Sequence, residues 1–358
     1  MNLKRSFELL QAYRGVAALM VLLYHASPLF HEALGSNLLV FFGACGYAGV
    51  DIFFVLSGFI IFYVHRADLG RPERFKNFIT KRLIRVFPAY WLANLVVVPI
   101  YFIAPNFGED RYRDIGCIIS SLMLLPQRDH PILTVGWTLT HELLFYAFFA
   151  LGIAFPGRLT RILAIGWLGL SLLMAPFAGS LAQGNYLLFG FLLSRYNIEF
   201  ALGCLCAYLA LRFRPKFALS FTWLGATTLL TACAFDFLTG GGAEPYRVIA
   251  YGLPAALLVV GSVWLEQERP VTVPSVLKFL GDASFSLYLV HLPLLSLAIK
   301  LVAGLRVTTV VGSYGAMLFC ILLTLFGGII FHIMVERPLQ KILSQTIVKG
   351  RKSVQQTT

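Results

Sequence analysis

The sequence predicts an all-α, polytopic membrane protein with about ten transmembrane helices and both termini in the cytoplasm. Its 358 residues are 58% hydrophobic and only 13% charged, and its mean hydropathy is +0.77. Soluble domains are nearer half apolar and a quarter charged. The composition leaves no room for a separate soluble domain. We therefore expect one membrane-embedded domain over residues 1–340 and a basic, disordered cytoplasmic tail over residues 341–358.

Ten apolar stretches have about the length that a bilayer crossing requires. They are Leu9–Leu29, Phe41–Val64, Phe87–Ile103, Thr134–Phe155, Ile162–Gly179, Leu187–Leu209, Phe217–Leu238, Val248–Leu265, Phe285–Leu305 and Val307–Val335. With the N-terminus inside, about twenty-one Lys and Arg residues fall in cytoplasmic segments and about six in outer segments, which supports this orientation. Ile115–Leu125 is apolar but too short to cross, so we expect a re-entrant or interfacial segment.

Several classes of protein are excluded. The net charge of +12 is spread over the loops between spans, which favours topology setting at a membrane surface over nucleic-acid binding. The six cysteines show neither paired nor metal-type spacing, and no phosphate-binding glycine motif is present, so we expect no metal and no redox function. Glu8 and Arg14 interrupt the first apolar run, which is therefore retained as a span rather than cleaved as a signal peptide.

The first span carries an arginine and a histidine, Arg14 and His25, which are eleven residues apart. In an α-helix this spacing puts both side chains on one face, separated by about 16 Å along the axis. Ionisable groups within a span are costly and usually functional. His25 could serve as a proton acceptor, and Arg14 could bind an anionic group. The alternatives are a packing histidine and an arginine that extends to the cytoplasmic interface.

The second span begins with Asp51 and contains the small pair Ser57–Gly58. A carboxylate in a membrane needs a partner, and Asp51 is a candidate to orient the ring of His25. The alternative is a charge stabilised by the helix dipole. Ser57 and Gly58 predict a place where a helix or a substrate approaches closely.

The densest basic region is Glu73–Val86, where apolar residues fall on one side of a predicted helix. This pattern predicts an interfacial amphipathic helix before the third span. Arg82 and Arg85 are three residues apart and could bind the phosphates of a nucleotide cofactor. The alternative is binding to lipid headgroups.

The fourth span opens with Trp137 and carries Glu142 and Tyr146. Glu142 is a second intramembrane carboxylate that could orient His25, or an interfacial charge solvated by the adjacent loop. Trp137 and Tyr146 could form a wall for a sugar or belong to the aromatic belt at the interface.

Other polar residues in the spans give weaker signals. The ninth span contains Tyr288 and His291, and His291 is a candidate substrate-binding residue. His332 and Glu336 are four residues apart near the end of the last span, and a local pair is expected there.

As an ordered set, these motifs resemble the acyltransferase-3 family of integral-membrane acyltransferases, nearest to its exopolysaccharide-type branch. The resemblance covers about residues 10–338. The matching stretches are LQAYRGVAALMVLLYHA, GVDIFFVLSGFI, RLIRVFPAYW, WTLTHELLFY, IEFALGC, FSLYLVHLPL and ERP. Thr138, His141 and His291 stand in less typical versions of their motifs, which affects the expected acceptor more than the expected reaction.

The resemblance implies an enzyme of a bacterial inner membrane that transfers an acetyl group from acetyl-CoA to a hydroxyl of a carbohydrate, lipid-linked or polymeric glycan. It implies Arg14 and His25 as the essential pair and Arg82 and Arg85 as the donor-binding motif. His25 would act as a base or carry the acyl group itself. The alternative is a transporter or flippase for a lipid-linked sugar, which shares the architecture. The absence of a convincing internal repeat argues against that alternative.

Overall fold

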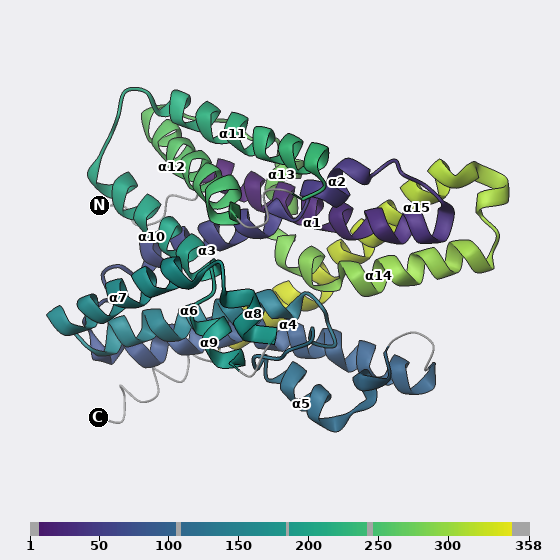
Figure 1. Cartoon of the computed structure of the whole chain (residues 1–358), viewed down its shortest axis with the longest axis horizontal. Coiled ribbons are helices and arrows are strands. Elements are labelled where there is room, and N and C mark those ends of the chain that lie inside the picture. Colours follow the sequence, from purple (N-terminus) through teal and green to yellow (C-terminus); the bar gives the residue numbers. More distant parts are fainter. Residues whose placement is uncertain (1–6, 105–108, 184–185, 242–245, 346–358) are drawn as a thin grey trace.

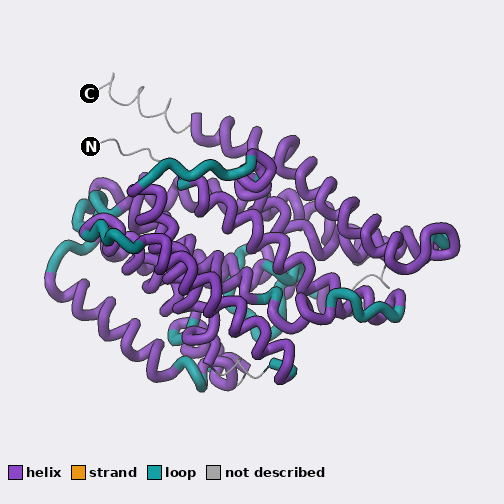
Figure 2. Tube along the Cα trace, turned by 90° about the horizontal axis from the view of Figure 1, so that it is seen from above, coloured by secondary structure: helices purple, strands orange, loops and turns teal. Residues whose placement is uncertain are grey.

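A computed structural model describes residues 7–104, 109–183, 186–241 and 246–345. Figure 2 shows helices and connecting loops throughout this described part of the chain. The α-helices are α1 (Glu8–Leu34), α2 (Val40–Cys45), α3 (Ala48–His65), α4 (Phe75–Ile103), α5 (Ile115–Leu122), α6 (Gly136–Ala154), α7 (Arg158–Met174), α8 (Ala178–Gln183), α9 (Leu187–Leu192), α10 (Tyr196–Arg212), α11 (Ala218–Thr239), α12 (Leu253–Glu268), α13 (Ser275–Asp282), α14 (Ser284–Gly304) and α15 (Thr308–Phe331). This confirms the predicted all-α class.

Nine helical stretches in the described ranges are long and apolar enough to cross a membrane, and they coincide with nine of the ten expected spans. The remaining expected span is α7, whose 17 residues are near the lower limit for a crossing. The first and last long helices have their outer chain ends on the same side of the bundle (Figures 1 and 2). The orientation in the cell stays a prediction.

The basic segment and the third span form one helix, which differs from the prediction. α4 runs without interruption for 29 residues and contains Pro88 and Pro99. We expected an interfacial helix to end before Pro88, but a proline can be accommodated inside a transmembrane helix when neighbouring groups satisfy the freed carbonyl. At about 43 Å, α4 is longer than the hydrocarbon core, so its basic first half extends beyond it.

The short segment after α4 does not cross. α5 has eight residues, and it is fixed to α4 by hydrogen bonds from two aromatic side chains. Tyr90 donates to the carbonyl of Ser121 over 2.8 Å, and Trp91 donates to that of Leu122 over 2.9 Å. This confirms the expectation that the apolar stretch is too short for a span.

Close backbone contact between α3 and α10 fixes the centre of the bundle. A Cβ atom on Gly58 would lie 2.0 Å from the carbonyl oxygen of Phe200, and one on Gly203 would lie 2.0 Å from that of Val55. The small pair predicted at Ser57–Gly58 therefore serves helix packing at Gly58, whereas Ser57 faces a cavity.

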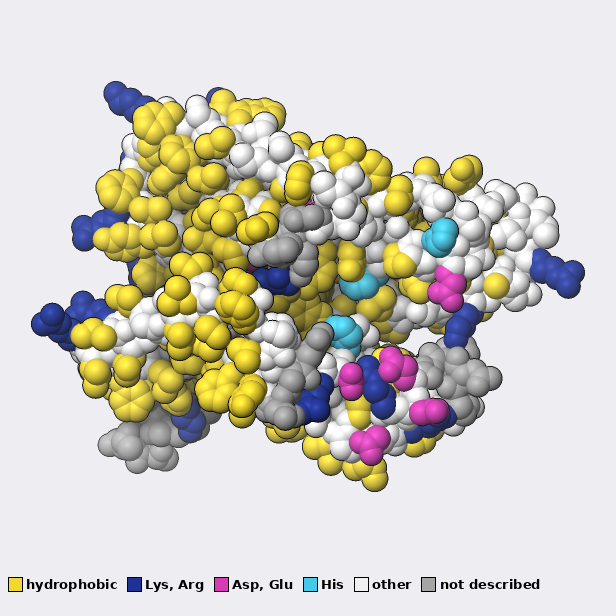
Figure 3. All heavy atoms as spheres, viewed as in Figure 1, with side chains coloured by type: hydrophobic (Ala, Val, Ile, Leu, Met, Phe, Trp, Pro, Cys, Tyr) yellow, Lys and Arg dark blue, Asp and Glu magenta, His cyan; other side chains and the backbone are white. Residues whose placement is uncertain are grey.

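The surface agrees with a membrane-embedded chain. Figure 3 shows hydrophobic side chains over the left and central part of one face, with Lys and Arg side chains at its left edge and acidic side chains gathered over α5. The last helix continues through a π-helical turn (His332–Glu336) as far as Gln345, so the first residues of the expected tail are helical. Residues 346–358 of that tail lie outside the described ranges.

Candidate functional site

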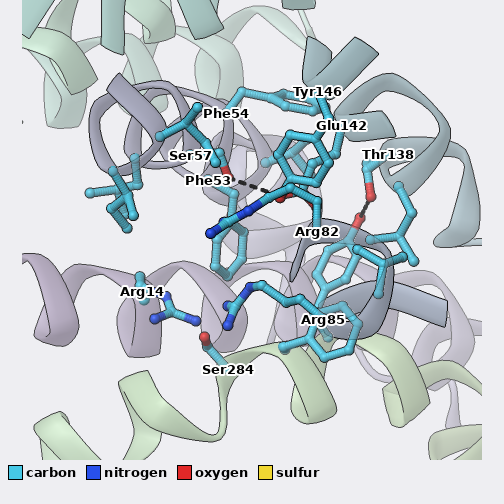
Figure 4. Close-up of a pocket in the computed structure, with 18 residues that line it drawn as sticks. Arg14, Phe53, Phe54, Ser57, Arg82, Arg85, Thr138, Glu142, Tyr146 and Ser284 are labelled. Carbon is cyan, nitrogen blue, oxygen red and sulfur yellow. Dashed lines mark hydrogen bonds between the residues drawn. The ribbon is translucent and has the colours of Figure 1, made fainter. Parts of the chain in front are cut away.

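A cavity of about 280 Å³ lies between α1, α3, α4, α6 and α14. Its charged lining consists of three guanidinium groups, on Arg14, Arg82 and Arg85, and the carboxylate of Glu142. Figure 4 shows the three arginines directed into the same space. Since positive charge exceeds negative charge on the walls, the cavity is suited to an anionic ligand. All four are candidate functional residues from the sequence, and the structure brings them together around one cavity.

Arg82 is held in place by a chain of polar contacts. The Nδ1 atom of His65 lies 2.8 Å from a carboxylate oxygen of Asp68, and an Nη atom of Arg82 lies 3.3 Å from Nε2 of the same ring. Because the carboxylate accepts from Nδ1–H, Nε2 of a neutral His65 accepts from Arg82. The guanidinium also lies over the ring of Tyr146, 5.7 Å from its centroid. His65 was missed in the sequence, although Asp68, three residues later, was a usable signal.

Glu142 lies in the cavity wall and accepts two hydrogen bonds on one oxygen. Ser57 donates over 3.2 Å and Tyr146 over 2.5 Å. Tyr146 is therefore part of the cavity wall and not of the interfacial aromatic belt. Trp137, which we grouped with it, stacks on Tyr47 at 6.0 Å outside the cavity lining, and its proposed contact with substrate stays a prediction.

Arg14 and His25 have different surroundings, although one helix carries both. Arg14 lines the cavity and donates to the side chain of Gln11 over 2.9 Å. His25 is not among the described residues of the lining. Its Nδ1 atom lies 3.0 Å from the carbonyl oxygen of Val21 and 3.1 Å from Nε2 of His291.

A pair of hydroxyl groups in the cavity wall lies near this histidine pair. Thr138 and Tyr288 both line the cavity, and their oxygens are 2.9 Å apart. The Tyr288 ring lies 5.9 Å from the ring of His291, which is one turn further along α14. Tyr288 therefore joins the cavity wall to the histidine pair. His291, predicted as a substrate-binding residue, instead contacts the predicted base directly.

The prediction that Asp51 orients His25 is wrong. The side chain of Asp51 is fully buried and accepts two hydrogen bonds from Arg247, over 3.1 Å from Nε and 2.6 Å from an Nη atom. Its carboxylate therefore faces the segment before α12 rather than α1. Glu142 does not orient His25 either, because its hydrogen bonds go to Ser57 and Tyr146. Arg247 was missed because 196 residues separate it from Asp51 and no local pattern links them.

The expected pair of His332 and Glu336 is confirmed, and it joins two helices. Glu336 accepts from His332 over 2.8 Å and from Ser286 of α14 over 2.6 Å. Among the described residues, no three or more His, Cys, Asp or Glu side chains are grouped so that they could hold a metal ion.

The comparisons with known proteins agree with this arrangement. Residues 9–333 match the acyltransferase domain of the acyltransferase-3 family. The chain is 32% identical to the exopolysaccharide production protein ExoZ of Rhizobium meliloti over 305 residues, which are 82% of this chain and 89% of that protein. It is 30% identical to protein 2 of the picA locus of Rhizobium radiobacter over 164 residues, 40% of this chain and 81% of that protein. No solved structure was found to match. The chain therefore belongs to the acyltransferase-3 family and is a multi-pass membrane acyltransferase.

Proposed function

We propose that the protein is an O-acyltransferase that moves an acetyl group from acetyl-CoA to a hydroxyl of an exopolysaccharide or its lipid-linked precursor. One observation carries the proposal: within an acyltransferase chain, three arginines line one cavity, and Tyr288 in its wall lies next to His291, the partner of His25. The carbohydrate acceptor is supported by the likeness to a relative whose name refers to exopolysaccharide production.

The donor is proposed from the charge of the cavity. Coenzyme A carries phosphates at one end and a thioester on a long neutral arm. Guanidinium groups bind phosphate through charge-assisted hydrogen bonds, and Arg14, Arg82 and Arg85 are available for this. The roughly 16 Å of helix between Arg14 and His25 is a span that an extended arm is needed to bridge.

His25 is the proposed base. A carbonyl can only accept, so the Nδ1 atom of His25 next to Val21 carries a proton and Nε2 is unprotonated in the neutral ring. Nε2 would remove the proton of the acceptor hydroxyl while the hydroxyl oxygen attacks the carbonyl carbon of the thioester. The carbon–sulfur bond then breaks, and the thiolate of CoA takes a proton from the imidazolium.

A two-step route uses the same groups. Nε2 of His25 would attack the thioester, release CoA and hold the acetyl group until the acceptor hydroxyl attacks. Both routes require the thioester to come close to His25, and in the second route the acceptor hydroxyl approaches only after CoA has left.

The test uses the purified protein in liposomes with labelled acetyl-CoA and exopolysaccharide fragments from cells that lack the gene. The wild-type protein should form an O-acetylated, base-labile product, and His25→Ala should form none while unfolding at the wild-type temperature. Transfer by a folded His25→Ala variant would overturn the role of His25. Movement of a lipid-linked sugar without a covalent product would favour a flippase instead.

A further inference from the structure

A second, more open pocket of about 430 Å³ lies between the first half of α4 and the last described helix. Its polar lining consists of Lys81, Arg85, Arg337, Gln340, Lys341 and Ser344. Four of these six side chains are cationic, and the lining includes no carboxylate among the described residues. We refer to it as the basic pocket.

Two basic helix faces meet in the basic pocket. Lys81 and Arg85 are four residues apart on α4, and Arg337 and Lys341 are four residues apart on the last helix, so each pair shares one face. Like charges held close together destabilise one another unless an anion lies between them. The carboxylate of Glu336 is adjacent in sequence but accepts from Ser286, His332 and Gln340.

Arg85 connects the basic pocket to the cavity of the candidate site, because it lines both. The two spaces differ in chemistry. The cavity contains hydroxyl, aromatic and aliphatic side chains beside its arginines, whereas the basic pocket is lined almost entirely by cations and amide or hydroxyl groups. A molecule that fits both would have a phosphorylated head and a long, mainly neutral arm.

We infer that the basic pocket binds the phosphorylated nucleotide end of the acyl-CoA donor, with Arg337 and Lys341 contacting its 3′-phosphate. This inference rests on the proposed function and extends it to two residues of the last helix. Arg85 would then lie between the 3′-phosphate and the diphosphate, and Arg82 and Arg14 would face the diphosphate from the cavity side.

The experiment measures dissociation constants of the full-length protein in neutral-lipid nanodiscs for CoA and for dephospho-CoA, which lacks the 3′-phosphate. The Arg337→Ala/Lys341→Ala variant should bind CoA about tenfold or more weakly than the wild type, since a hydrogen bond to a charged group is worth about that factor. Its affinity for dephospho-CoA should change about threefold or less. The matched control is Arg214→Ala/Lys216→Ala, which removes two exposed cations from the loop between α10 and α11 and should change neither affinity.

Three results would separate the explanations. If wild-type protein binds and uses acetyl-CoA but Arg337→Ala/Lys341→Ala binds CoA equally well, the inference is wrong and the proposed function stands. If the variant instead loses only a response to anionic lipid added to the nanodiscs, the pocket is a headgroup site and the inference is also wrong. If wild-type protein neither binds nor uses acetyl-CoA, the proposed function itself fails.

Discussion

His25 of α1 and His291 of α14 form a direct pair, with 3.1 Å between Nδ1 of His25 and Nε2 of His291. The Nδ1 atom of His291 lies 2.8 Å from the carbonyl oxygen of Tyr288, so that nitrogen carries a proton and Nε2 of the neutral ring accepts. His25 therefore donates its Nδ1–H towards both Val21 and His291. The pair fixes the tautomer of His25 that leaves Nε2 free for chemistry.

His291 is expected to position the base rather than to bind the acceptor. His291→Ala should lower kcat by about ten- to a hundredfold, less than the roughly 10²–10⁴-fold contribution of a general base. His291→Gln, whose amide oxygen can accept from His25, should recover part of the rate. The measurement is the steady-state rate of acetyl transfer as a function of pH. His291→Ala should shift the part of this pH profile that reflects the ionisation of His25. A change confined to the KM for the acceptor would instead support substrate binding by His291.

His65 is expected to orient Arg82 for the donor. His65→Ala should raise the dissociation constant for CoA by about three- to tenfold, because one hydrogen bond and the fixed direction of the guanidinium are lost. His65→Gln retains an acceptor and serves as the conservative control. Equal CoA affinity for wild type and His65→Ala, measured by calorimetry, would show that Arg82 needs no such support.

Glu142 is expected to weaken anion binding in the resting cavity. Glu142→Gln keeps the acceptor for Ser57 and Tyr146 but removes the negative charge beside three arginines. CoA should therefore bind about two- to fivefold more tightly, and its binding should depend more steeply on salt. Unchanged CoA affinity together with a loss of transfer above a hundredfold would identify Glu142 as a group that acts on the reaction itself.

Asp51 is expected to matter for stability. Removing one partner of a buried ion pair leaves an uncompensated charge and costs about 3–5 kcal/mol, so Asp51→Ala should lower the Tm in detergent strongly. Asp51→Asn/Arg247→Met should recover part of that loss, since it removes both charges. Wild-type Tm with abolished transfer in Asp51→Ala would return Asp51 to the reaction.

The segment before α5 should loosen in acid. Glu109 accepts from Arg111 over 2.6 Å, and this hydrogen bond holds the pKa of the Glu109 carboxyl below its usual 4.5. Because the pKa of Glu109 is lower in the folded protein than in the unfolded chain, ionised Glu109 stabilises the fold. This stabilisation is complete at pH values above the unfolded-state pKa and is lost as the pH falls through the folded-state pKa. The effect is below about 1 kcal/mol, because the Glu109 side chain is 61% exposed. Protection from hydrogen exchange over residues 109–130, measured relative to the intrinsic exchange rate at each pH, should fall at acid pH in the wild type, whereas Glu109→Gln should show the lower protection already at neutral pH.

The fold was largely predictable because each span satisfies its own backbone hydrogen bonds, so length and apolarity suffice to find it. The helix ends were predicted less well, because length and apolarity do not show where one helix stops and the next begins. We expected a new helix to begin near Pro88, yet α4 runs through it from Phe75. The link that separates α9 from α10 lies inside one apolar stretch.

The candidate site was predictable in part. Arg14 and Glu142 were identified from the cost of charges within a membrane, and Arg82 and Arg85 from their spacing in the densest basic segment; all four line one cavity. Their partners were not identified. Asp51 was assigned to His25, but a carboxylate near the start of α3 can reach several helices, and only the tertiary packing selects Arg247. The pairing of His25 with His291 likewise spans 266 residues of chain and has no sequence signature.

The hydroxyl pair of Thr138 and Tyr288 has a consequence for the membrane as a barrier. A continuous aqueous passage wide enough for a thioester would also conduct protons and ions and dissipate the gradients that the cell maintains. With Thr138 and Tyr288 in contact, the cavity on the arginine side ends before His25 is reached. In the proposed reaction, an acyl group would then reach His25 without an aqueous passage that stays open across the membrane.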